Sequence, residues 1–250
     1  MIIVNSDDFG LSDSVNLATK NAFERMLISS TTLIVNMQGY NSALQMIKKK
    51  YVKKDSVGIH VNLQEGFPIT DEIKNLNICN SNGEFNYSFR NNSHFFKDKL
   101  FLSIVKDEID AQINKFKNDL KSTPTHLDSH DHTHNEFFMI KIISELISDH
   151  SINYYRPPRN IGEIKFYKIL YKKIYRHYAN RCGLKSVDYF GNIIDFQNIK
   201  INHQKSYELE VHCMFKDNIL TDSGISFESK LFDFTRNKNL KNYNLLSKNR

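Results

Sequence analysis

The chain has 250 residues, of which 40% are hydrophobic and 12% aromatic, and its formal net charge is +6. This length allows one large domain or two small ones, and the apolar content excludes a globally disordered chain. The positive charge favours anionic partners only weakly, and the lack of a Walker loop, a dinucleotide-binding glycine motif and zinc-finger spacing argues against nucleic acid as a partner.

Cysteine usage and the first residues indicate where the protein acts. Cys79, Cys182 and Cys213 are scattered and odd in number, which is typical of free thiols in a reducing compartment. The segment Met1–Asn5 runs directly into acidic residues, so it lacks the long apolar core of a secretory signal. No stretch approaches the roughly 18 apolar residues of a membrane-spanning helix. We therefore expect a cytoplasmic protein.

The first part of the chain alternates between β-branched runs and amphipathic segments. Short β-branched runs followed by polar residues predict buried strands at Ile2–Val4, Thr31–Val35 and Val57–Leu63. Apolar residues at helical spacing predict helices at Ser12–Leu27 and Asn41–Tyr51. Either Ser12 or Asp13 is expected to cap the first helix, because its side-chain oxygen can accept a free backbone N–H.

The rest of the chain continues this alternation after an interruption. Residues 70–97 are rich in Asn and lack periodicity, which predicts a long loop or insertion. The elements predicted after it are a helix at Leu100–Leu120, a histidine-rich strand from His126, a helix at Glu136–Asp149, a strand at Tyr154–Arg156, a basic helix over Ile164–Arg181 and a late strand at Tyr207–His212. From Phe227 onward we expect a terminal helix and a frayed C-terminal tail.

The order of these elements predicts the fold. Strands and helices alternate for most of the chain without a linker and without an internal repeat. Such alternation favours a parallel α/β sheet that is closed, or nearly closed, into a barrel. We predict a single domain over residues 1–250.

The strongest chemical signal is the segment Thr125–His134, which contains four histidines and two aspartates. Alternate residues of an extended strand point to the same side, so His126, Asp128, His130 and His132 are expected to line one face. Imidazoles and carboxylates that converge in this way are suitable ligands for a divalent metal. A solvated histidine-rich loop is the alternative.

Three further polar groups are expected near strand ends: Asp7–Asp8, His60 and His212. Alone, the aspartate pair could cap a helix, and His60 could be an ordinary core histidine. In a barrel, however, the carboxyl ends of the strands meet around one mouth, which brings these groups to the histidine-rich segment. A metal held by one carboxylate and two imidazoles keeps open coordination positions for water and a substrate oxygen. Such a site is suited to hydrolysis of an amide or ester.

At this point the sequence resembles the YdjC-like carbohydrate deacetylases, a family that includes chitooligosaccharide deacetylases. The resemblance is carried by ordered motifs over residues 1–160: Asn5–Leu11, Ser30–Met37, Gly58–Pro68, Thr125–His134 and Arg156–Arg159, with a weaker echo at Glu208–His212. It implies a distorted TIM-barrel-like fold and removal of acetyl groups from N-acetylated sugars.

The resemblance also implies roles for individual residues. Asp8, His60 and His130 would be the metal ligands, Asp7 the general base, and His212 the group that protonates the leaving amine. The resemblance places Asp128, His132, His134 and Arg156 in supporting or substrate-orienting positions, and His126 in either a supporting or a packing role. The chain departs from the family at Ser6, where Ala is usual, and at Cys213–Met214, where a Pro-Gly or similar turn is typical. The second departure leaves the role of His212 open.

These inferences predict a metal-dependent hydrolase that releases acetate from an N-acetylated amino sugar, either an oligosaccharide or a lipid-linked precursor of envelope glycans. Two imidazoles favour Zn²⁺ or another transition ion, while the family resemblance also allows Mg²⁺. The alternatives are a catalytically silent glycan- or metal-binding module and a metal-dependent esterase or phosphoesterase.

The predicted basic helix indicates which kinds of partner the protein could contact. Lys165–Arg181 carries six basic residues among aromatic and aliphatic ones. This composition is typical of an ordinary surface helix with a solvated basic face, and it also suits peripheral contact with an anionic membrane, which would place the protein at the inner face of the membrane. The sequence does not indicate an oligomeric state.

Overall fold

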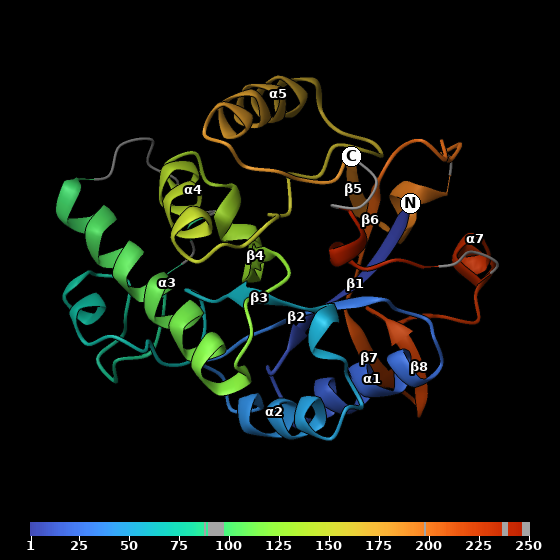
Figure 1. The fold of residues 1–250 in the computed structure, drawn as a ribbon, viewed down its shortest axis with the longest axis horizontal. Coiled ribbons are helices and arrows are strands. Elements are labelled where there is room, and N and C mark those ends of the chain that lie inside the picture. Colours follow the sequence, from blue (N-terminus) through green and yellow to red (C-terminus); the bar gives the residue numbers. More distant parts are fainter. Residues whose placement is uncertain (88, 90–97, 198, 237–239, 247–250) are drawn as a thin grey trace.

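The protein is built around one parallel β-sheet, as a computed structural model shows (Figure 1). The structure describes residues 1–87, 89, 98–197, 199–236 and 240–246. Six strands lie in the order β4-β3-β2-β1-β6-β5, and every neighbouring pair is parallel. Their bounds are β1 Ile2–Phe9, β2 Ser30–Leu33, β3 Val57–Val61, β4 Leu127–Ser129, β5 Tyr189–Asn192 and β6 Tyr207–Val211.

The sheet curls into a distorted half-barrel, and an extended segment lies between its two edge strands. At one edge, Tyr155 forms a parallel bridge with Leu127 of β4. At the other, the backbone N–H of Asn160 donates to the carbonyl of Phe190 in β5, at 3.1 Å. The prediction of a nearly closed α/β barrel is therefore confirmed, with an irregular segment where a regular barrel has strands.

Helices cover the outer side of the sheet (Figure 1). Their bounds are α1 Asp13–Glu24, α2 Tyr40–Lys48, α3 Lys99–Leu120, α4 Met139–Asp149 and α5 Phe166–Arg181, with single turns at α6 Ile193–Phe196 and α7 Asp233–Arg236. The expected cap of α1 is present, since the Ser12 hydroxyl accepts the backbone N–H of Val15. Among the described residues, no helix is long and apolar enough to cross a bilayer.

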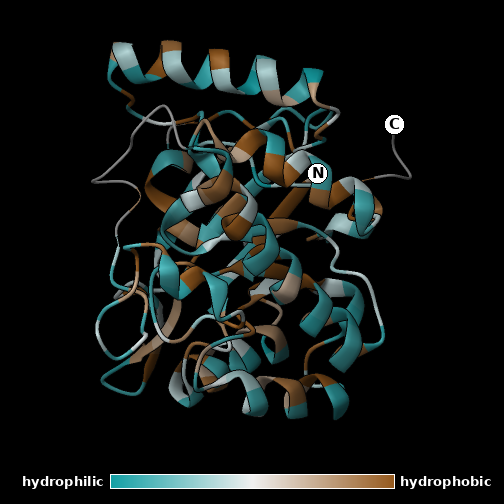
Figure 2. Cartoon of the chain, turned by 90° about the vertical axis from the view of Figure 1, so that its left-hand side faces the viewer, coloured by the Kyte–Doolittle hydropathy of each residue, from teal (hydrophilic) through white to brown (hydrophobic). Residues whose placement is uncertain are grey.

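The two sides of the sheet differ in polarity. The outer side packs against the helices through a large apolar core that includes Ile59, Ile109 and Ile143. The inner side, by contrast, carries buried polar residues such as Asn5 and Asp128. α5 lies outermost, above α4 (Figure 1), and hydrophobic residues are interspersed along its length (Figure 2). The apolar side therefore stabilises the sheet, and the polar side is free for chemistry.

Several expected elements differ in extent or are wrong. β1 continues to Phe9, slightly beyond the expected end of the strand at Asn5 to Asp8, because polar residues such as Asn5 and Asp7 find partners inside the barrel. The antiparallel sheet of β7 Cys213–Lys216, β8 Ile219–Asp222 and β9 Ile225–Ser226 was not expected, nor was β5. The predicted loop 70–97 includes a short 3-10 turn at Glu72–Asn75, and residues 88 and 90–97 lie outside the described part.

The C-terminal prediction is also wrong. Instead of a terminal helix, the chain after Phe227 forms only single turns, at Lys230–Phe232, Asp233–Arg236 and Tyr243–Leu245. The expected frayed tail is packed as far as Leu246, and Tyr243 is fully buried. Residues 247–250 lie outside the described part. Tyr243 and Leu246 of this segment pack in the cluster around Ile3, and the side-chain amides of Asn242 and Asn244 donate to the Asp55 carbonyl.

Candidate metal-dependent active site

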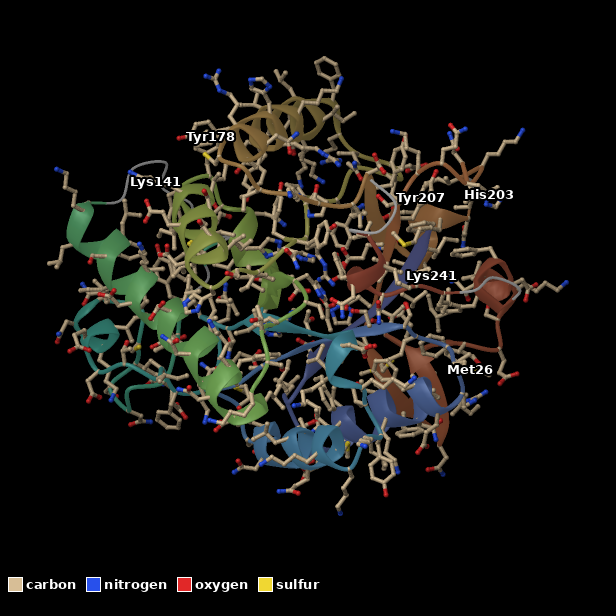
Figure 3. The ribbon with its side chains drawn as sticks, viewed as in Figure 1. Met26, Lys141, Tyr178, His203, Tyr207 and Lys241 are labelled. Atoms are coloured by element: carbon tan, nitrogen blue, oxygen red, sulfur yellow. The ribbon has the colours of Figure 1, made fainter. Side chains whose placement is uncertain are left out.

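The sheet brings the candidate residues to one mouth. Asp7 and Asp8 lie near the carboxyl end of β1, and His60 lies near that of β3. His130 and His212 directly follow β4 and β6. Because parallel strands end at the same edge, these side chains meet inside the curve of the sheet, where polar side chains are concentrated (Figure 3).

Asp8, His60 and His130 form the first group. The Asp8 Oδ1 atom lies 3.2 Å from His60 Nε2 and 2.8 Å from His130 Nδ1. One ligand atom from each residue lies within 4.8 Å of the other two. Asp8 and His130 are slightly exposed, so the group is open to a substrate.

A backbone irregularity places both aspartates in the site. Neighbouring residues of a strand normally point to opposite faces. Between Ser6 and Phe9, however, β1 holds one residue more than the facing stretch of β2, and Asp8 adopts a left-handed φ of 63°. This bulge turns Asp8 toward the site without removing Asp7 from it, at the cost of backbone strain that is typical of functional positions.

Asp128 and Thr32 contact the Nδ1 side of the His60 ring and set its orientation. Its Nδ1 atom lies 2.6 Å from Asp128 Oδ1 and 3.1 Å from the Thr32 hydroxyl, so its Nε2 atom faces Asp8. Burial opposes protonation of His60, but the carboxylates of Asp128, Asp8 and Asp7 together outweigh it and raise the pKa of His60 well above its usual value. A carboxylate behind a histidine is the arrangement that orients metal-ligating imidazoles.

Arg156 binds three buried carboxylates. Its guanidinium pairs with both oxygens of Asp7, at 2.5 and 2.6 Å, and with Asp128 at 2.9 Å. Its Nε donates to Glu208 at 2.7 Å. Burial raises the pKa of Asp7, but Arg156 more than offsets this and keeps that pKa well below its usual value. Arg156 is fully buried, so it supports the site and does not reach the cleft.

Pairing with Arg156 distinguishes the group of Asp8, His60 and His130 from three other groups of residues. In each of those, the possible ligand atoms also lie close enough together to hold an ion. Those groups are Asp7, His60 and Asp128; Asp7, Glu210 and His212; and His126, Asp128 and Glu208. Each includes at least one carboxylate that Arg156 already neutralises. Asp8 contacts only imidazoles among the ion pairs of the described residues, so its charge is available for a metal.

Glu210 and His212 lie beside Asp7. Glu210 Oε1 is 3.6 Å from His212 Nε2 and 3.4 Å from His132 Nε2. Burial raises the pKa of Glu210 to about 7. Burial opposes the charged form of His212, but nearby carboxylates, first Asp7 and then Glu210, outweigh it and raise the His212 pKa.

The histidine-rich segment is not a continuous strand, so that prediction is wrong. β4 ends at Ser129, and a 3-10 turn follows at His130–Asn135, with left-handed φ values at Asp131 and His132. His132 therefore reaches Glu210 from a turn, not from a strand face. The tight turn is what brings His130 to Asp8.

Two histidines of this segment are buried away from the cleft. His134 Nδ1 lies 2.7 Å from the Ser129 hydroxyl and its Nε2 lies 3.1 Å from the Arg156 carbonyl, so the ring holds the turn in place. The His126 ring stacks on Tyr243, with ring centres 3.7 Å apart. Neither contributes to the group around Asp8, and a substrate-orienting position for His134 is not what the structure shows.

A family model described as YdjC-like protein matches residues 1–245. The chain belongs to the YdjC-like family. A protein named carbohydrate deacetylase from Danio rerio is 28% identical over 76% of this chain and 60% of its own length. A chitooligosaccharide deacetylase from Proteus mirabilis is 27% identical over 91% of this chain and 87% of its own. This YdjC-like chain thus spans about three fifths of the length of the zebrafish relative.

A solved structure supports the fold. A protein of Enterococcus faecalis V583, provisionally described as a cellobiose-phosphate cleavage protein, superimposes with a TM-score of 0.70 over 98% of each chain. Its sequence identity is 19%, so this likeness establishes the fold alone. The resemblance to the family seen in the sequence motifs is thereby confirmed at the level of family and fold.

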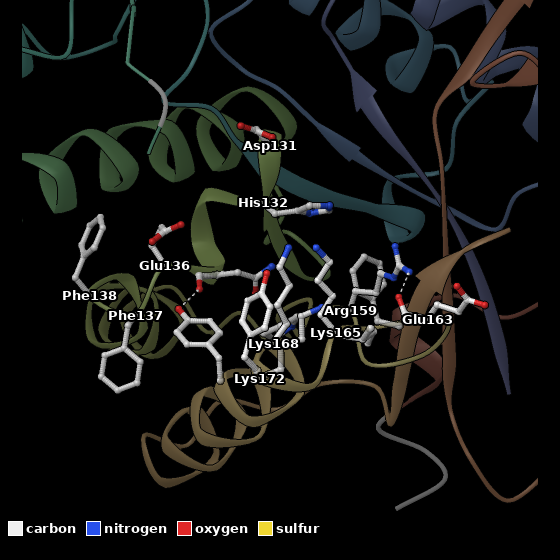
Figure 4. Close-up of a pocket in the computed structure, with 16 residues that line it drawn as sticks. Asp131, His132, Glu136, Phe137, Phe138, Arg159, Glu163, Lys165, Lys168 and Lys172 are labelled. Atoms are coloured by element: carbon white, nitrogen blue, oxygen red, sulfur yellow. Dashed lines mark hydrogen bonds between the residues drawn. The ribbon is translucent and has the colours of Figure 1, made fainter. Parts of the chain in front are cut away.

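Two adjoining clefts open at the mouth of this YdjC-like barrel. The first, of about 530 Å³, is lined by Asp7, His60, His130, Glu210 and His212 among others. The second, of about 720 Å³, lies between α5 and the turn after β4, and both clefts share Asp131 and His132. Lysines of the α5 side point across the second cleft toward His132 (Figure 4). A chain-like ligand could occupy both clefts together.

Sequence reasoning assigned no role to three residues that the structure places in or under the site: Glu208, Glu210 and Tyr243. The alternation Glu208-Glu210-His212 along a strand was a usable signal, because alternate residues share a face. No local signal marked Tyr243, whose hydroxyl donates to Glu208 from the C-terminal segment. At Cys213–Met214, where the chain departs from the typical turn of the family, the Cys213 side chain is buried. Burial raises the pKa of its thiol to about 12, as expected of a packing residue.

Proposed function

We propose that this protein is a metal-dependent hydrolase that removes the acetyl group from an N-acetylated amino sugar. The observation that carries the proposal is the convergence of Asp8, His60 and His130, whose two histidines line one cleft together with Asp7 and His212. The names of the relatives support an amide of a sugar as the substrate class.

The donor set fits a divalent metal. One carboxylate and two imidazoles are suitable for Zn²⁺ or another transition ion, and they leave positions for water and substrate. Asp128 behind His60 supplies the orientation that such a ligand requires. When bound, the ion would polarise the amide carbonyl and lower the pKa of a water molecule.

Asp7 is suited to accept a proton from that water. Arg156 keeps the Asp7 carboxylate ionised throughout the neutral range; the low pKa also makes it a weak base, which suits a water molecule whose own pKa a bound ion would lower. The same ion pair fixes the direction of the carboxylate, because both of its oxygens are held by the planar guanidinium. Rigid placement is what a general base needs.

His212 is suited to protonate the departing nitrogen. It lines the same cleft, and its half-exposed side chain can meet a substrate. The carboxylates of Asp7 and Glu210 favour its charged form and raise its pKa, which makes it a better proton carrier at a given pH than an unperturbed imidazole. A base and an acid on one cleft complete the parts needed for amide hydrolysis.

The second cleft provides room for the remainder of the sugar substrate. Its walls combine aromatic rings, including Phe137 and Tyr171, with the polar ends of lysines such as Lys168. Its volume lies within the range of small-molecule sites, roughly 300–1,000 Å³. Because it adjoins the first cleft at His132, an acetylated ring at the metal group can continue into it.

Acetate release tests the proposal. The chelated protein is given Zn²⁺, Mg²⁺ or another divalent ion singly, together with N,N′-diacetylchitobiose or a lipid-linked N-acetylhexosamine. We expect metal-dependent acetate, and loss of both metal binding and turnover in His130→Gln. His203→Gln removes an exposed histidine outside the site and is the matched control. Stoichiometric metal binding without acetate from either substrate would contradict the proposal, and release of phosphate from a phosphoester would favour a phosphoesterase.

A further inference from the structure

The two faces of α5 have different environments. On the inner face, the Tyr175 hydroxyl donates to the His134 carbonyl at 2.7 Å. The Arg176 guanidinium donates to the carbonyls of Val187 and Asp188, at 2.6 and 2.8 Å. These bonds hold the helix firmly against the barrel, so its outer face is presented in a fixed orientation.

The outer face carries an apolar stripe formed by Phe166, Leu170 and Ile174. These side chains are 83%, 55% and 52% exposed, whereas the Tyr178 ring next along the helix stacks on Phe137. They are spaced four residues apart, so each lies next to the previous one along the helix. Figure 2 shows hydrophobic residues on this outermost helix. A continuous exposed apolar surface of this kind marks a site of interaction.

The charge beside the stripe indicates what covers it. α5 contains neither Asp nor Glu, and although Lys168 and Lys172 line the second cleft and Arg176 binds backbone carbonyls, two basic residues remain for the outer side. Lys173 and Arg181 are exposed on the same outer side. A second copy of this surface would bring like charges together, which is unfavourable at an interface. An anionic bilayer satisfies both the apolar stripe and the cations.

We propose that α5 is an interfacial helix that docks the protein on an anionic phospholipid surface. The stripe would enter the boundary between headgroups and acyl chains, while the basic side chains would contact phosphate groups. Docking concerns the outer face of α5 and does not depend on the reaction at the metal group. The cleft that opens beside the inner part of α5 would then lie close to the membrane.

Co-sedimentation with vesicles tests the proposal. We expect the full chain to bind vesicles of phosphatidylcholine mixed with phosphatidylglycerol, and not vesicles of phosphatidylcholine alone. Binding should weaken as salt screens the charges. Wild-type protein that ignores the anionic vesicles at low salt would overturn the proposal.

Two sets of substitutions separate the contributions. In K173Q/R181Q, which retains the stripe, the partition coefficient should fall roughly fivefold per charge removed, about 25-fold together. In F166S/L170S/I174S, which retains the charges, it should fall more than roughly tenfold. None of these five side chains lines either cleft, so acetate release from a water-soluble substrate should be unchanged.

Met26 offers the matched control. It is 83% exposed, like Phe166, and Figure 3 places it well away from Tyr178 of α5. M26S should bind vesicles as the wild type does, and unchanged circular dichroism should show that all variants are folded. Equal vesicle binding by the stripe variant and wild type would refute the proposal. So would a wild-type dimer that becomes a monomer in the stripe variant without any binding to lipid, since the stripe would then be a contact between copies.

Discussion

Arg156 provides the sharpest test of the site's electrostatics. Its guanidinium is fully buried and pairs with Asp7, Asp128 and Glu208 at 2.5 to 2.9 Å. Arg156→Met keeps an apolar side chain of similar length and removes the charge. The three carboxylates then remain buried with no guanidinium among them.

The expected loss of stability is large. Breaking a buried ion pair by removing one partner costs about 3–5 kcal/mol, and a domain unfolds with about 5–15 kcal/mol in all. Arg156→Lys should cost less, about 1–3 kcal/mol, because it retains a charge but loses the planar fork that holds both oxygens of Asp7.

The pH dependence of that loss identifies its cause. In the wild type, Arg156 depresses the Asp7 pKa, so this pair stabilises the fold above the usual aspartate pKa and loses its effect as the pH falls. Without Arg156, burial raises the pKa of the buried carboxylates, and the variant becomes less stable as the pH rises through those values. The difference from wild type should therefore be larger near pH 8 than near pH 5, by up to about 1.4 kcal/mol per pH unit and per proton.

Urea unfolding followed by circular dichroism at a series of pH values gives these differences. Arg25→Met is the matched control, because Arg25 pairs with Glu228 on the surface, and its loss should cost at most about 1 kcal/mol. A loss below about 1 kcal/mol in Arg156→Met, or one that does not change with pH, would refute the reasoning.

Three other predictions concern the residues around the site. Asp128→Asn should lower metal affinity about 10- to 100-fold in titration calorimetry, because His60 loses the carboxylate that orients it; an unchanged affinity would contradict this role. In Glu210→Gln, the His212 pKa should fall, so the alkaline limb of kcat/KM should move to lower pH, and a limb that stays in place would show that Glu210 does not act on His212. Tyr243→Phe removes a hydrogen bond to a buried carboxylate and should cost about 1–3 kcal/mol in thermal unfolding, whereas no change would indicate that the C-terminal segment is dispensable.

The sequence was sufficient for the class of fold and for most of the elements up to α5, but not for β5, the sheet of β7–β9 or the C-terminal turns. Strands such as Val57–Val61 are β-branched and fully buried, and helices such as α3 have apolar residues at helical spacing. These patterns depend on neighbours along the chain, so they can be read locally. The meeting of Asp8, His60 and His130 at one mouth also followed from the sequence, because parallel strands end at a common edge.

Only the tertiary structure shows which partners neutralise each acidic residue. Asp7 and Asp8 are adjacent in sequence, yet Arg156 neutralises one and leaves the other to two imidazoles. The bulge in β1, the left-handed turn after Ser129 and the buried Tyr243 likewise have no local signature. The physical reason is that the charge and direction of a buried side chain are set by groups from distant segments, through distances that the fold alone establishes.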